Sequence, residues 1–131
     1  MKPGVEKILA YLKERGFLIA IASSTSVALV EQQIRDAGLI KYFDVIVGGD
    51  QVSKSKPAPD IFIKAAELLG IRPESAYVIE DSYNGIRAAK TAGMRPIMVP
   101  DMVEATEEIE KLLYKKFESL LEVKEFLISL N

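Results

Sequence analysis

The stretch Tyr-Val-Ile-Glu-Asp-Ser-Tyr-Asn-Gly, residues 77–85, decides the fold class. The apolar run 76–79 is typical of a parallel strand buried on both faces, and a helical pattern follows it from Tyr83. Two adjacent acids, Glu80 and Asp81, lie at the junction. Ligands of open α/β sheets bind at the carboxyl ends of the strands, so these acids are expected at a site. Mg²⁺ takes carboxylate oxygens and would relieve their mutual repulsion, whereas the alternative is a solvated loop.

Composition limits the function classes. The chain has 131 residues, 49% of them hydrophobic, a formal net charge of −2, and neither Cys nor His. This indicates one domain, 1–131, with no nucleic-acid partner, no disulfide, no Ser-His-Asp triad and no His metal ligand. No apolar run approaches the roughly 20 residues of a membrane span, and no signal peptide is evident, so we expect a cytoplasmic protein without a membrane partner.

Helical and strand patterns alternate along the chain. This alternation predicts a three-layer α/β fold, with a parallel sheet between two layers of helices. A capping-box spacing, Ser119 to Glu122, adds a final helix on Val123, Phe126, Leu127 and Leu130. The other helices are expected over 3–15, 27–37, 60–69, 83–92 and 106–116, and the strands over 17–22, 43–47, 76–79, 95–99 and, at an edge, 117–120.

Polar residues follow two further strands. Ser23 and Ser24 lead into a helix, where hydroxyls and backbone N–H groups could cradle a phosphate, although simple N-capping by Ser26 is the alternative. Lys56 lies in a loop that two prolines stiffen, so its ammonium is expected to be aimed at a phosphate, whereas Lys54 is expected to be solvated. Together with the acids, these groups predict a site for Mg²⁺ and a phosphoryl group.

Three strings carry a family resemblance: Ile21-Ala22-Ser23-Ser24, the Lys-Pro-Ala-Pro-Asp-Ile-Phe of 56–62, and the Val-Ile-Glu-Asp-Ser-Tyr-Asn-Gly-Ile of 78–86. Together they resemble the haloacid dehalogenase superfamily, in particular its β-phosphoglucomutase-like phosphatases and phosphomutases. The resemblance implies a Rossmann-like core and a small phosphorylated metabolite as substrate.

The same resemblance implies a role for each matching residue. Ser23 and Ser24 would bind the phosphoryl group, and Lys56 would neutralise it and orient the nucleophile. Asp81, with Glu80, would hold Mg²⁺. Gly85 would let the helix start pass close to the site, with Asn84 as a supporting residue; a local turn requirement is the alternative reading of Gly85.

One departure from the family is large. The family's nucleophile is the first Asp of an Asp-x-Asp-Gly-Thr string that ends the first strand, and this string is absent from the sequence, as is the helical cap. The chain therefore resembles a partial core domain: a fragment, a proteolysis product, a mis-started gene or one piece of an assembly. The family's reaction passes through an aspartyl-phosphate, so we expect no phosphatase turnover from this chain alone.

The missing strand is central in the resembled fold. The strands over 17–22 and 76–79 would then each present an unpaired edge. We expect a missing N-terminal segment or another chain to complete the sheet, and the isolated chain to be unstable or to self-associate. Direct pairing of the two strands is the alternative.

Other functions stay open or are disfavoured. A non-catalytic binding module or pseudoenzyme subunit is the main alternative. A receiver-type signalling domain is disfavoured because the acidic pair follows the third strand, and a dinucleotide-binding fold because no G-x-G-x-x-G string is present. The sequence leaves the substrate, and the choice between phosphatase and mutase, undecided.

Overall fold

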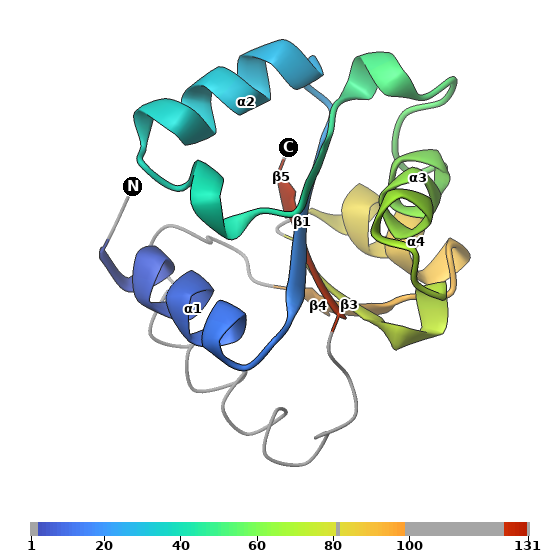
Figure 1. The fold of residues 1–131 in the computed structure, drawn as a ribbon. Coiled ribbons are helices and arrows are strands. Elements are labelled where there is room, and N and C mark those ends of the chain that lie inside the picture. The colour runs from blue at the N-terminus through green and yellow to red at the C-terminus, as the bar shows by residue number, and fades with distance from the viewer. Residues whose placement is uncertain (1–2, 81, 99–124, 131) are drawn as a thin grey trace.

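A parallel sheet forms the middle layer of the structure, a computed structural model that describes residues 3–80, 82–98 and 125–130 (Figure 1). Its strands are β1 (Leu18–Ser23), β2 (Val45–Val47), β3 (Ala76–Glu80), β4 (Arg95–Met98) and β5 (Glu125–Leu130). Their order is β2-β1-β5-β3-β4, and every neighbouring pair is parallel. The predicted α/β class is confirmed.

Helices cover both faces of this sheet, as Figure 1 shows. Helices α1 (Pro3–Glu14) and α2 (Val27–Asp36) lie on one side, and α3 (Asp60–Leu69) and α4 (Tyr83–Thr91) lie on the other. Each of these four matches a predicted helix to within a residue or two. Short 3-10 turns, η1 to η3, occupy Ile40–Tyr42, Gly49–Gln51 and Pro73–Ser75.

Alternation along the strands divides the core into two apolar clusters. Ile21 and Ile79 pack with α1 and α2, whereas Ala22 and Val78 pack with α3 and α4. Successive strand residues are thus buried on opposite faces, as the continuous apolar runs of the sequence predict. The same alternation determines on which face of the sheet the side chain at each strand end lies.

The prediction for the C-terminal segment was wrong. Residues 125–130 form the central strand β5, in register with all six residues of β1 and with four residues of β3, instead of a helix. The slot between β1 and β3, for which we expected a missing N-terminal segment or another chain, is thus filled in this structure by the chain's own segment. Backbone groups of β1 and β3 need partners, and this non-local demand outweighs the local helical spacing.

Some predicted elements lie outside the described residues: the helix over 106–116, the edge strand over 117–120 and residue 99 of the fourth strand. Among the helices that the structure describes, none has the length and apolar character needed to cross a bilayer.

Candidate functional site

Lys56 and Glu80 form a buried ion pair at the carboxyl end of β3. Lys56 Nζ lies 3.1 Å from Glu80 Oε2, and the side chains are 6% and 0% exposed. The ammonium also lies 5.4 Å from the centre of the Phe62 ring, which α3 contributes to the core. A buried charge is tolerated when it is paired and hydrogen-bonded, so the carboxylate of Glu80 holds the ammonium of the loop lysine in place. Lys54, two residues earlier, is exposed, as predicted.

The start of α4 packs tightly against the same carboxylate. Ser82 Oγ donates a hydrogen bond to Glu80 Oε1 at 3.2 Å and accepts one from the Gly85 backbone N–H at 3.1 Å, which caps the helix. A Cβ added at Gly85 would overlap the Glu80 carboxylate, and no L side chain fits there without displacing it. Gly85 therefore allows the close approach expected of it.

Ser23 ends β1 and is buried, with 2% exposed. Its Oγ accepts a hydrogen bond from the Thr25 backbone N–H at 3.2 Å, so the hydroxyl hydrogen is directed elsewhere. Ser24, the next residue, is exposed. The hydroxyl of Ser23 is thus fixed at the sheet rim and can donate to an anion.

The helix that follows is capped in an unexpected way. Ser26 occupies the N-cap position of α2, but its side chain makes no capping hydrogen bond. Instead the Val27 backbone N–H donates to Asp50 Oδ1 at 2.8 Å, across from the neighbouring strand end. Ser26 thus occupies the N-cap position that the sequence offered for it, but its hydroxyl does not cap the helix, and the first amide of α2 has an anionic partner instead.

The two halves of the site lie on opposite sides of β5. Side chains two residues apart on a strand point to the same face of the sheet. Ser23 is therefore on the α1/α2 face with Ile21, whereas Glu80 is on the α3/α4 face with Val78. Ile21 and Ile79 both pair with Ile128 of β5, so the two strand ends lie about 10 Å apart, two sheet spacings. Ser23 and Glu80 therefore lie on either side of the end of β5, at the carboxyl-end rim of the sheet.

The metal prediction rests partly on Asp81, which lies outside the described residues. The described residues hold no group of three or more acids that could bind an ion. Glu80 offers carboxylate oxygens, the ligand type that Mg²⁺ prefers, and in this structure these oxygens accept hydrogen bonds from Lys56 and Ser82. Asn84 is exposed on the first turn of α4.

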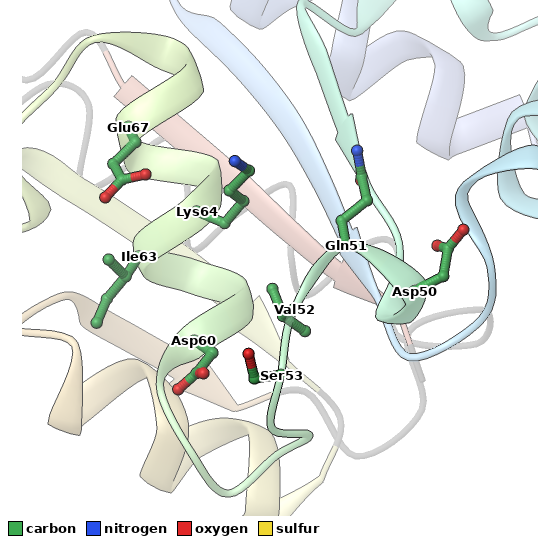
Figure 2. Close-up of a pocket in the computed structure, with 8 residues that line it drawn as sticks. All are labelled: Asp50, Gln51, Val52, Ser53, Asp60, Ile63, Lys64 and Glu67. Carbon is green, nitrogen blue, oxygen red and sulfur yellow. The ribbon is translucent and has the colours of Figure 1, made fainter.

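A separate cleft of about 610 Å³ lies between η2 and α3 (Figure 2). Among the residues that the structure describes, none of the predicted site residues lines it. Its lining residues are Asp50, Gln51, Val52, Ser53, Asp60, Ile63, Lys64 and Glu67. The cleft combines three acids with one lysine, which does not favour phosphate. The rim between β1 and β3, not this cleft, carries the groups suited to a phosphoryl ligand.

Sequence reasoning missed two features of the site. One is the pairing of Lys56 with Glu80, which are 24 residues apart in the chain. The other is the 48–50 turn, whose Gly-Gly-Asp string directly follows β2 and to which we assigned no role from the sequence. Its position at a third strand end was the available signal.

Comparison with known proteins identifies the family and agrees with this fold. The family model described as haloacid dehalogenase-like hydrolase matches residues 1–99. The phosphorylated carbohydrates phosphatase of Thermotoga maritima is 42% identical over 95 residues, which cover 72% of this chain and 44% of that protein. The crystal structure of CbbY from Rhodobacter sphaeroides in complex with phosphate aligns with this chain at a TM-score of 0.70 and 43% sequence identity. The alignment covers 76% of this chain and 46% of the CbbY chain.

A β-phosphoglucomutase from Clostridium difficile aligns at a TM-score of 0.76 and 25% identity, over 92% of this chain and 58% of that one. The chain belongs to the haloacid dehalogenase-like hydrolase family, and its relatives include β-phosphoglucomutase-like proteins. It spans between 28% and 53% of the length of four of the curated relatives that it matches.

Proposed function

We propose that this chain provides the phosphate-binding part of a Mg²⁺-dependent phosphoryl-transfer enzyme. The enzyme would be a β-phosphoglucomutase-like phosphatase or phosphomutase that acts on a small phosphorylated metabolite through an aspartyl-phosphate. The observation that carries the proposal is the ammonium of Lys56, 6% exposed and bonded to Glu80 at the carboxyl end of β3, with Ser23 across β5 from it. One relative named for phosphorylated carbohydrates, and another solved with phosphate, support the substrate class.

Two side chains would bind the phosphoryl group. Ser23 would donate its hydroxyl hydrogen, since its oxygen already accepts the Thr25 N–H. Lys56 would donate a charge-assisted hydrogen bond; an ammonium has three N–H donors, so the bond to Glu80 is compatible with one to phosphate. Ser24, exposed beside Ser23, would add a contact at the entrance. The fixed positions of Ser23 and Lys56 would stabilise charge that develops during transfer.

Asp81, with Glu80 beside it, would hold Mg²⁺. The ion would supply neutralisation of the negative charge on the phosphoryl oxygens. The attacking carboxylate is not among these residues, because the sequence contains no Asp-x-Asp-Gly-Thr string. These residues would bind and polarise the group. The nucleophile would come from outside this sequence, and because β5 fills the slot between β1 and β3, it would have to reach the rim beside the end of β5 or displace that strand.

The test is the affinity for inorganic phosphate, measured by isothermal titration calorimetry on the full 131-residue chain. Lys56→Ala should weaken binding by about tenfold or more, because a hydrogen bond to a charged group is lost. The matched control Lys54→Ala removes an exposed lysine of the same loop and should stay within about twofold. Circular dichroism checks that each variant is folded.

Ser23→Ala provides a second variant, since Lys56→Ala leaves Glu80 buried without its ammonium. It should weaken phosphate binding by about tenfold or more, because a hydroxyl that donates to an anionic phosphate makes a charge-assisted hydrogen bond. Equal losses for Lys54→Ala and Lys56→Ala, or a wild-type chain that binds no phosphate, would overturn the proposal.

A further inference from the structure

The 48–50 turn after β2 lies against the 23–27 loop after β1. The Gly49 backbone N–H donates to the Thr25 carbonyl at 2.8 Å, and the Val27 N–H donates to Asp50 Oδ1 at 2.8 Å. The turn itself is fixed, because the Gly48 N–H donates to Gln51 Oε1 at 2.8 Å. Two hydrogen bonds therefore tie two neighbouring strand ends together.

Both glycines of this turn are required by close packing. A Cβ on Gly49 would overlap the carbonyl of Ser24, and a Cβ on Gly48 would overlap the backbone of Val27. Neither glycine has a positive φ, so conformational freedom does not explain them. The turn is shaped to approach the serine loop, not merely to end a strand.

Asp50 extends from this turn toward the serine loop. In Figure 2 its carboxylate lies on the far side of the turn from Ile63 and Lys64. Although Asp50 lines the cleft, its carboxylate bonds α2. A carboxylate at a helix N-terminus accepts backbone N–H groups and is favoured by the helix dipole.

We propose that Asp50 is a positioning residue for phosphate binding: by accepting the Val27 N–H, it holds the 23–27 loop so that Ser23 and Ser24 face the rim. This inference rests on the proposed function. The role of Asp50 would be indirect, because the electrostatic field of its negative carboxylate would by itself repel a phosphate.

Because of that repulsion, the two possible roles of Asp50 predict opposite changes in phosphate affinity when Asp50 is replaced. If Asp50 contributes only charge, its removal should leave phosphate affinity unchanged or raise it. If it positions the loop, removal of the acceptor should lower the affinity. Asp50→Ala removes both charge and acceptor, whereas Asp50→Asn removes the charge and keeps an oxygen that can accept the Val27 N–H.

The experiment measures inorganic phosphate affinity by isothermal titration calorimetry for these two variants and for Asp36→Ala, which removes an exposed acid at the opposite end of α2. We expect a loss of about fivefold for Asp50→Ala, and affinity equal to or tighter than wild type for Asp50→Asn and Asp36→Ala. Urea unfolding confirms that each variant is folded; a purely structural role would shift only the unfolding midpoint.

Phosphate binding by Asp50→Ala as tight as wild type would overturn the inference and leave the proposed function intact. Asp50→Asn as weak as Asp50→Ala would also overturn it, because the accepted hydrogen bond would then not be what matters. A wild-type chain that binds no phosphate would overturn the proposed function itself.

Discussion

The carboxylate of Glu80 has no exposed surface, and an unpaired charge in that position would be costly. Lys56 and Ser82 each bond one of its oxygens, and Gly85 leaves room for it beside α4. Glu80 thus links the loop, the strand and the helix that meet at the rim. Its first role in this structure is to fix the ammonium that we propose for phosphate binding.

Gly85→Ala tests how closely α4 packs on Glu80. The intrinsic helix preference favours Ala over Gly by about 0.5–1 kcal/mol. The added Cβ would nevertheless overlap the Glu80 carboxylate, so we expect a net loss of about 1–3 kcal/mol in the free energy of unfolding, measured by urea denaturation.

Asn84→Ala is the control, since Asn84 is exposed on the same turn and should change stability by less than about 0.5 kcal/mol. A stabilised Gly85→Ala variant would show that the helix start yields easily and that Gly85 serves only its own turn.

At the scale of elements, local signals predicted most of the fold. Helix α3 spans Asp60–Leu69 as expected, and Gly70 ends it with a φ of 72°. The three strands β1, β3 and β4 fall within a residue or two of the apolar runs. These signals are local: an apolar period, a glycine stop, a strand followed by polar residues.

Features that depend on distant partners were not predictable in this way. Residues 125–130 show a short apolar run that periodicity alone cannot assign, and pairing with β1 and β3 makes it a strand. The Lys56–Glu80 pair and the Asp50 bond to Val27 likewise join segments 23 or 24 residues apart. Their residue types were visible in the sequence, but their partners depend on the order of the strands.

The position of β5 leads to a spectroscopic prediction. The ¹³Cα chemical shifts of 125–130 should be those of a strand, and their amides should exchange about as slowly as those of β1, because a central strand is paired on both sides. Helical shifts over these six residues would show that the C-terminal segment leaves the sheet, and that the slot between β1 and β3 is open to another strand.

At the scale of the whole molecule, the three-layer fold places the polar side chains of the candidate site at one end of the sheet. Parallel strands place Ser23 and Glu80 at the same end of the sheet, and helices on opposite faces cover their two sides. The chain carries a net charge of −2, so an anion is not attracted by overall charge and must be bound by local groups. Lys56 is the cation that the described structure holds buried at this rim.

The central claim is that a phosphoryl group binds at this rim, between Ser23 and Lys56. The most direct measurement is a titration of the ¹⁵N-labelled chain with inorganic phosphate, following backbone amide shifts. We predict saturable shifts centred on 23–25, 56 and 82–85, which Lys56→Ala removes and Lys54→Ala retains. Shifts centred instead on the cleft residues 50–53 and 60–67, or shifts unaffected by Lys56→Ala, would contradict it.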